Sequence, residues 1–169
     1  CVAFVDDQIG KVVKAVNNSR YADNTIIVVT SDHGYHMGEK EYIFKSSLWE
    51  ESARVPFIVA GKNVAKGKQC SNPISLIDVY PTIVDMCDLP DNPNVNGNKK
   101  PLDGNSLLPL LQHPEKGEWD GNDFAITAVS SSYQLEVDQP APVKTQHYSI
   151  RTEKYRYIYC RNGEEELYN

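Results

Sequence analysis

The chain has 169 residues, a length that favours about one domain. Apolar residues make up 40% of it and charged residues 24%, which is typical of a folded protein rather than a disordered one. The 17 basic and 23 acidic side chains give a net charge of −6, so we expect no nucleic-acid partner. No apolar run approaches the ~20 residues of a membrane-spanning helix, so we expect no membrane span either.

Neither end of the chain has the character of a natural terminus. The sequence begins at Cys1 without Met, and it stops at Asn169 inside an unbroken polar and aromatic stretch. We therefore expect part of a larger protein. The cysteines are too far apart for a zinc ribbon, and buried free thiols are the first expectation, with disulfides as the alternative. They are Cys1, Cys70, Cys87 and Cys160.

The first third of the chain predicts a helix followed by two strands. Apolar residues from Val5 to Val16 recur at helical spacing, and the polar stretch 17–24 should end that helix. Residues 25–30 and 56–61 are continuous apolar runs. Such runs are typical of strands buried on both faces, as in a parallel sheet. The order of elements indicates an α/β layer.

A second helix is predicted after Asp78, whose side chain can cap it, with Pro81 in its first turn. Ile83, Val84 and Cys87 would then face inward, and residues 106–112 form a possible short helix.

The last third of the chain has a different pattern. Residues 124–129 and 148–160 alternate apolar and polar side chains, and Asn162-Gly163 is a hairpin-type turn. We therefore predict a small antiparallel β subdomain after the α/β part, with the boundary near residue 118.

The most informative segment follows the first predicted strand and contains Asp32 and His33. Ligands of open α/β sheets bind beyond the carboxyl ends of strands, and a carboxylate beside an imidazole can bind a metal ion. Two ligands cannot complete a metal shell, so others must come from elsewhere. The alternative is an ordinary turn, with Asp32 bonding a nearby N–H and His33 solvated.

Several motifs follow one another along the chain. They are Thr30-Ser31-Asp32-His33-Gly34, Met37-Gly38-Glu39-Lys40, Lys45, residues 49–56, Val5-Asp6-Asp7-Gln8-Ile9-Gly10, Asp78-Val79-Tyr80-Pro81-Thr82, residues 102–107, 148–152 and 155–158. Together these collinear motifs resemble the C-terminal half of a sulfatase, closest to the branch with iduronate-2-sulfatase and choline sulfatase. Ser-Asp-His-Gly alone would be shared with the wider alkaline-phosphatase superfamily.

The resemblance implies a fold class and a division of the chain. Residues 1–118 would be the C-terminal part of the large α/β domain, a mixed sheet sandwiched by helices. Residues 119–169 would be a small, truncated antiparallel β subdomain.

The resemblance also implies site roles. Asp32 and His33 would help to hold a divalent cation, expected to be Ca²⁺, although imidazole by itself suggests a transition metal. Lys45 would be catalytic by contacting the sulfate group; without the resemblance it would be read as a solvated lysine. Glu39 and Arg54 are expected to hold the loop.

Four further residues are candidates for substrate binding. Tyr35 and His36 lie in the site loop, His147 precedes the matching motif 148–152, and Arg151 belongs to that motif. The alternatives are that Tyr35 packs, that both histidines are solvated, and that Arg151 pairs with a carboxylate between the two domains.

The Cys/Ser-x-Pro-x-Arg motif that supplies the formylglycine nucleophile of such sulfatases is absent from this chain. We therefore expect it in the missing N-terminal half, a partner that this chain needs, and expect the chain alone to be inactive.

The resulting hypothesis is a sulfuric ester hydrolase acting on a sulfated carbohydrate or another sulfate ester. Its location would be extracytoplasmic: periplasmic, lysosomal or secreted. One alternative is a metal-dependent phosphomonoesterase or phosphodiesterase of the same superfamily. The other is a non-catalytic relative that binds a sulfated glycan, which would need a local basic patch on this acidic chain.

Overall fold

A computed structural model describes residues 1–90, 101–130 and 145–169, and it confirms the predicted fold class. The helices are α1 (Val2–Asn17), α2 (Glu50–Ala53), α3 (Val79–Met86) and α4 (Leu108–Gln112). The strands are β1 (Ile27–Thr30), β2 (Phe57–Ala60), β3 (Ala125–Ser130), β4 (Gln146–Arg151), β5 (Arg156–Tyr159) and β6 (Glu165–Tyr168). None of the helices in these ranges is long and apolar enough to cross a bilayer.

The two apolar runs pair with each other, but not in the predicted direction. β1 and β2 are antiparallel, with Ile27 opposite Ala60 and Thr30 opposite Phe57. Their side chains are half-buried or exposed, so the expectation of a parallel sheet buried on both faces is wrong for this pair. An apolar run does not specify whether the strand beside it runs parallel or antiparallel. The segment 31–56 leaves and returns at the same end of the pair, whereas parallel strands require a crossover.

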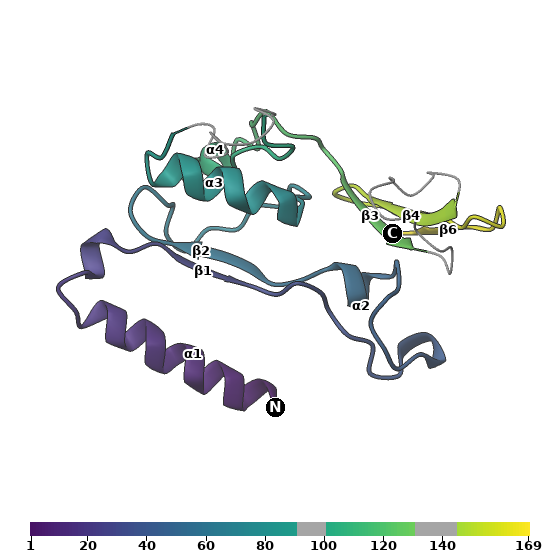
Figure 1. Ribbon diagram of the computed structural model, residues 1–169, viewed down its shortest axis with the longest axis horizontal. Helices are drawn as coiled ribbons and strands as arrows, with labels where there is room; N and C mark the ends of the chain where they lie inside the picture. The colour runs from purple at the N-terminus through teal and green to yellow at the C-terminus, as the bar shows by residue number, and fades with distance from the viewer. Residues whose placement is uncertain (91–100, 131–144) are drawn as a thin grey trace.

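Helices lie on both sides of the β1–β2 pair (Figure 1). α1 lies on one side, and α3 and α4 lie on the other. α1 confirms the helix predicted from periodicity, but the structure leaves its apolar face uncovered, with Phe4 70% and Val12 65% exposed.

The buried centre of this part lies between α3 and α4. Leu107, Leu110 and Val84 are buried there, and the Thr82 hydroxyl accepts a hydrogen bond of 2.9 Å from the Leu107 N–H. Burial of these aliphatic side chains stabilises the helix pair by roughly 1.5–3 kcal/mol per side chain. This contact fixes the short helix predicted for residues 106–112.

Three details of the second helix differ from the prediction. Asp78 does not cap α3 with its carboxylate, which accepts the N–H groups of Ser75 and Asn105 at 2.9 Å and so closes the turn before the helix. Ile83 is 38% exposed and Cys87 is exposed, so only Val84 of the predicted inward set is buried.

The cysteines also differ from the first expectation. All four thiols are free, but Cys1, Cys70 and Cys87 are exposed and Cys160 is half-buried.

The last third of the chain forms the predicted antiparallel sheet, with strand order β3-β4-β5-β6. Alternation along β5 buries Arg156 and Ile158 on one face, and Ser149 of β4 lies opposite Ile158. Ile158 is 2% and Ser149 1% exposed. A guanidinium in such a buried position requires partners for its donors.

Those partners belong to the segment that carries α2. The Arg156 Nε and Nη2 atoms both lie 2.7 Å from Glu50 Oε2. Its Nη1 donates to the Leu48 carbonyl and to the Ser149 hydroxyl, each at 2.9 Å. One buried side chain therefore links the small sheet to the residues on both sides of Trp49, through the Leu48 carbonyl and the Glu50 carboxylate.

A second, more exposed group of contacts supports this link at the end of β6. The Trp49 Nε1–H donates to Glu166 Oε2 at 2.9 Å, and the Tyr168 hydroxyl donates to the same carboxylate. The Lys40 ammonium donates to the Tyr168 hydroxyl at 2.8 Å and lies 5.1 Å from the centre of the Trp49 ring. The hydrogen bond to Tyr168 raises the pKa of Lys40.

The loop after β1 is held against α2 by a close backbone approach. The Gly34 N–H donates to the Ser52 carbonyl at 2.8 Å. A Cβ atom placed on Gly34 would lie 1.9 Å from the Glu51 carbonyl oxygen. No side chain other than hydrogen fits there, so glycine fixes how closely the loop that follows His33 can approach α2.

We expect Gly34→Ala to destabilise the full-length protein by about 1–3 kcal/mol, because the backbone must move to relieve the overlap with Glu51. Gly10→Ala is the matched control, since nothing lies within 4 Å of its Cβ position in α1, and it should leave stability unchanged or raise it by up to about 1 kcal/mol. Equal effects of the two substitutions on denaturant unfolding would contradict this close approach.

We expect the Glu166 contact to depend on pH. The hydrogen bonds from Tyr168 and Trp49 lower the pKa of the Glu166 carboxyl below its ordinary value of 4.5. A lowered folded-state pKa stabilises the fold above the unfolded pKa, and this contribution is lost as the pH falls through the folded value. Glu166→Gln should therefore lower Tm by roughly 1–2 °C at pH 7 and by less near pH 4, a small effect because the site is partly solvated.

Thermal unfolding at the two pH values measures this difference. Glu164→Gln, which removes an exposed carboxylate from the same hairpin, is the control. A Tm difference for Glu166→Gln that stayed the same at both pH values would show that its carboxylate charge is not what the contact uses.

Candidate active site

Asp32 and His33 lie immediately beyond the carboxyl end of β1, as the sequence predicts. Because β2 is antiparallel to β1, the residues that enter β2 reach the same end of the pair, with Phe57 opposite Thr30. This arrangement brings Arg54 and Val55 to the surface that Asp32 and His33 also line. The position of the candidate site therefore follows from the strand pairing.

His33 and Lys45 are in direct contact. The His33 Nδ1 atom lies 2.8 Å from the Gly34 carbonyl oxygen, which can only accept a hydrogen bond, so we assign the ring proton to Nδ1. The lone pair of Nε2 then accepts from the Lys45 ammonium, 2.9 Å away. The contact brings together two of the predicted site residues, which are 12 positions apart in the sequence.

Asp32 completes this group of three side chains. Its Oδ1 accepts the His33 N–H at 3.0 Å, and its Oδ2 lies 3.5 Å from His33 Nε2. The Asp32 side chain is 84% exposed, so its second oxygen is accessible. The contact with the His33 N–H is the one expected of an ordinary turn, and it does not prevent Oδ2 from binding an ion.

The donor set of Asp32 and His33 fits part of a cation site. An ionised carboxylate oxygen and an unprotonated imidazole nitrogen lie 3.5 Å apart on an accessible surface. In the part of the chain that the structure describes, no third Asp, Glu, His or Cys joins them in a group that could hold a metal. The remaining ligands would have to come from outside these residues, as a two-ligand set requires.

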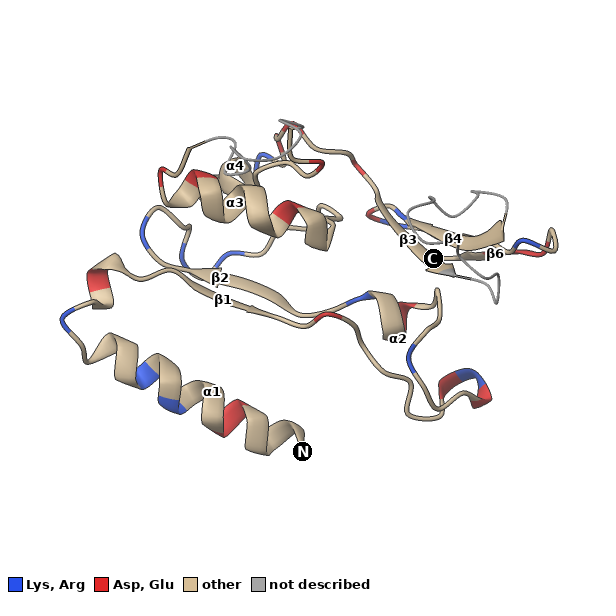
Figure 2. Cartoon of the chain, in the orientation of Figure 1, with Lys and Arg blue, Asp and Glu red and all other residues tan. Residues whose placement is uncertain are grey.

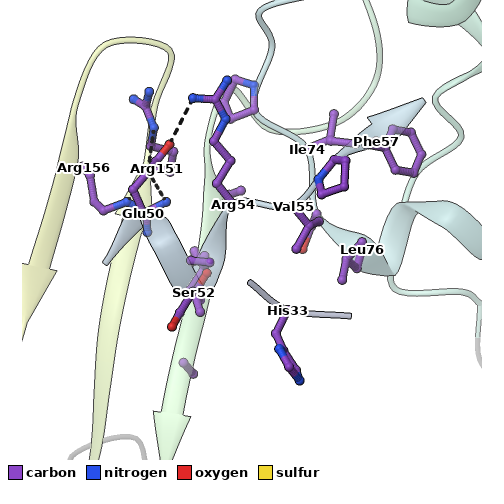
Figure 3. A pocket seen from close by; sticks show the side chains of 18 of the residues that line it. His33, Glu50, Ser52, Arg54, Val55, Phe57, Ile74, Leu76, Arg151 and Arg156 are labelled. Carbon is purple, nitrogen blue, oxygen red and sulfur yellow. Dashed lines mark hydrogen bonds and ion pairs between the residues drawn. The ribbon is translucent and has the colours of Figure 1, made fainter. Parts of the chain in front are cut away.

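All three side chains line a cleft of about 1100 Å³. One wall comes from the segments around α2 and β2, and the other includes β3 and the residues around Arg151 and Arg156 (Figure 3). The cleft therefore lies between the α/β part and the small sheet. Its lining is mixed in character and includes Pro56 and Ile74 as well as Ser52 and Asn72.

Arg151 lines this cleft, whereas the other three predicted substrate contacts do not. Arg151 lies in the wall with its Nε 3.6 Å from Glu50 Oε2, which also fits the alternative of a pair with a carboxylate between the two parts. Tyr35 is 47% exposed and packs edge-on against Phe44. His147 is half-buried in β4 opposite Val129.

The position of His36 does not fit a contact with substrate. It is fully buried, with its ring between those of Tyr42 and Trp49, and its Nε2 lies 2.8 Å from the Ser47 hydroxyl. Its aromatic neighbours, Tyr42 and Trp49, reach the His36 ring only when the loop is folded. The orientation of His36 depends on how the loop folds, so its closeness to His33 in the sequence did not predict it.

Of the two residues expected to hold the loop, Glu39 does so, whereas Arg54 makes only a loose ion pair with Glu50. The Glu39 carboxylate accepts the Met37 N–H at 2.7 Å, which lowers the pKa of Glu39. Arg54 lies 3.7 Å from Glu50, one helical turn away. Neither side chain contacts Asp32, His33 or Lys45.

Sequence reasoning missed Glu50 and Arg156, which join the two walls of the cleft. They are 106 positions apart, and neither has an unusual neighbour pattern. The one available signal was that Arg156 alternates with Ile158 on the apolar face of a predicted strand, where a charged side chain needs a buried partner.

The chain is similar to known proteins over nearly its whole length. The protein-family model described as Sulfatase matches residues 1–89. A sulfatase of Formosa agariphila is 33% identical over 169 residues, covering 100% of this chain and 29% of the relative. A choline-sulfatase of Rhizobium meliloti is 30% identical over 168 residues, covering 99% of this chain and 29% of the relative.

Two solved structures share the fold over nearly the whole chain. BT4656, in complex with its substrate D-glucosamine-2-N, 6-O-disulfate, gives a TM-score of 0.77 at 30% identity, covering 99% of this chain and 32% of that one. The phosphonate monoester hydrolase of Agrobacterium radiobacter gives 0.76 at 26% identity, covering 99% and 33%. The chain therefore spans about a third or less of the length of these proteins. It belongs to the sulfatase family.

Proposed function

We propose that the whole protein hydrolyses sulfate esters of a carbohydrate and that this chain contributes part of its active site. The observation that carries the proposal is the contact of Lys45 with His33 beside Asp32, at one end of a large cleft. Family membership supports hydrolysis of a sulfate ester as the general class. The chain covers 29% of its relatives, so the rest of the site belongs to residues outside it.

Lys45 is the residue of this chain that we assign to catalysis. Its ammonium lies at the cleft surface, 2.9 Å from a neutral imidazole that cannot neutralise it. A cation in this position would stabilise negative charge that develops on the sulfuryl and leaving-group oxygens. A preorganised positive charge of this kind acts without reorganisation at the moment of reaction.

Asp32 and His33 are the residues that would hold a divalent cation. When bound, such a cation lowers the pKa of the attacking group and orients the sulfate. The carboxylate suits Ca²⁺, the expected ion, while the imidazole by itself suits a transition metal. A cation bound at Nε2 of His33 would take the lone pair that now accepts the hydrogen bond from Lys45. The Lys45 ammonium would then be free to contact an anion.

The nucleophile would come from outside this chain. We propose a formylglycine in the missing N-terminal half, because no Cys/Ser-x-Pro-x-Arg motif occurs in the 169 residues. The chain alone should then be inactive toward an aryl sulfate even with metal present.

The substrate that we propose is a sulfated carbohydrate. One structural neighbour is solved with D-glucosamine-2-N, 6-O-disulfate as its substrate, which supports this class. Tyr35 and His147 remain proposed contacts with the substrate. Neither lines the cleft, so the full-length protein would have to bring each of them to it. An extracytoplasmic location, as expected from the resemblance, is part of the same proposal.

Two alternatives remain. One is hydrolysis of a phosphate or phosphonate ester, which is supported by the likeness to a phosphonate monoester hydrolase at 26% identity. The other is a relative that binds a sulfated glycan without turnover. The contact between Lys45 and His33 argues against a degenerate site, because both candidate groups are intact and adjacent.

We expect Lys45→Met in the full-length protein to lower kcat for a sulfate ester by roughly 10²–10³-fold, because one preorganised charge is removed. Lys68→Met, which removes an exposed lysine outside the cleft, should leave kcat within about twofold. Initial rates with a sulfate ester and the matching phosphate ester measure both the effect and the preferred reaction. A Lys45→Met enzyme with the wild-type rate, or faster hydrolysis of the phosphate ester, would contradict the proposal.

A further inference from the structure

Three guanidinium groups converge on the single carboxylate of Glu50, and Figure 3 shows them around it. Arg156 makes the close contacts, with two nitrogens 2.7 Å from Oε2. Arg151 Nε lies 3.6 Å from the same oxygen, and Arg54 Nη1 lies 3.7 Å from Oε1. Both of these distances exceed that of a hydrogen bond.

The single carboxylate of Glu50 can neutralise the charge of only one of these three guanidinium groups. Arg156 is 5% exposed and fixed by the Leu48 carbonyl and Ser149, so it is the permanent partner of Glu50. The side chain of Arg54 is 75% exposed and that of Arg151 is 30% exposed. Within residues 1–90, 101–130 and 145–169, Glu50 is the one carboxylate within 4.0 Å of either.

The surroundings add positive charge rather than remove it. Both arginines line the cleft that holds Lys45, and both also line an adjoining cavity of about 310 Å³ together with Lys40 and Lys154. Figure 2 shows basic and acidic residues interspersed along the chain, whose net charge is −6. Cations gathered along the cleft can attract an anionic ligand, and the cleft gives such a ligand access to them.

Two carboxylates near the arginines do not supply this compensation. Glu153 lines the cleft but accepts a hydrogen bond of 3.1 Å from the Ser71 hydroxyl, and no ion pair of 4.0 Å or less joins it to a described arginine. Glu51 lines the smaller cavity, and no ion pair of 4.0 Å or less joins it to a described arginine.

We propose that Arg54 and Arg151 form an anion-binding subsite that holds a second sulfate or carboxylate group of a sulfated carbohydrate while its reacting sulfate lies beside Lys45. This inference rests on the proposed function and narrows its substrate to sugars with two anionic groups. The guanidinium of Arg54 suits the role because its planar donors can bind two oxygens of a sulfate or carboxylate at once. The Nη1 atom of Arg151 already donates to the Thr152 carbonyl, so this residue would contribute its remaining donors. The link between Glu50 and Arg156 joins the two walls from which Arg54 and Arg151 project.

Binding to the full-length protein tests the subsite independently of turnover. Calorimetric titration would use three probes: D-glucosamine 2-N,6-O-disulfate, a 2-O-sulfated hexuronate, and N-acetylglucosamine 6-sulfate, which has one anionic group. Arg54→Gln/Arg151→Gln should raise Kd at least about tenfold for a probe with two anions and less than about twofold for the third. A larger effect on the disulfate or on the hexuronate identifies the second group as sulfate or carboxylate.

The control removes two positive charges that line neither cavity, as Lys66→Gln/Lys116→Gln. It should leave Kd of all three probes within about twofold. Arg54→Lys/Arg151→Lys should restore part of the lost affinity, because charge returns without the two-oxygen geometry. Thermal unfolding of each variant establishes that it is folded.

An equal loss of affinity for all three probes would overturn the subsite, since the arginines would then act on the fold or on the reacting sulfate. Unchanged affinity for the two-anion probes, or no binding of them by the wild type, would also overturn it. Sulfate release from the same probes reports separately on the proposed function. If the arginines discriminate between probes but no sulfate ester is hydrolysed, the proposed function fails and the subsite remains.

Discussion

The link between Arg156 and Glu50 is the interaction on which the cleft depends. Arg156 is buried in the small sheet, and its two contacts with Glu50 attach that sheet to the segment that leads from Lys45 to β2. A buried guanidinium without this partner would leave a desolvated charge uncompensated, which costs several kcal/mol. Holding the two parts together avoids this cost, and the cleft lies between them (Figure 3).

The same link explains how residues far apart in the sequence reach one site. Antiparallel pairing of β1 and β2 brings the entry to β2 beside Asp32 and His33, and the contact of Gly34 with α2 holds the loop between them. Lys45 then lies against His33 rather than in solvent. The chemistry proposed for this chain follows from that arrangement, and the family resemblance supplies the reaction class.

Much of the fold could be predicted from the sequence because its signals are local. The helical spacing of apolar residues predicted α1. The alternation of apolar and polar residues, together with the Asn162-Gly163 turn, predicted the antiparallel sheet. The direction of β1 relative to β2 and the burial of His36 could not be predicted, because both depend on how the segment 31–56 turns back. The residues of the candidate site came from a motif, while the contact of Glu50 with Arg156 joins positions that no local pattern connects.

A double-mutant cycle on Glu50 and Arg156 tests the central claim most directly. Denaturant unfolding of the full-length protein would be compared for Glu50→Gln, Arg156→Gln and the double variant. Because the two side chains are in contact, we expect each single substitution to be destabilising and the pair to show a coupling energy of about 1–3 kcal/mol. A coupling energy near zero would mean that the two side chains contribute independently, and it would contradict the account of how the cleft is held together.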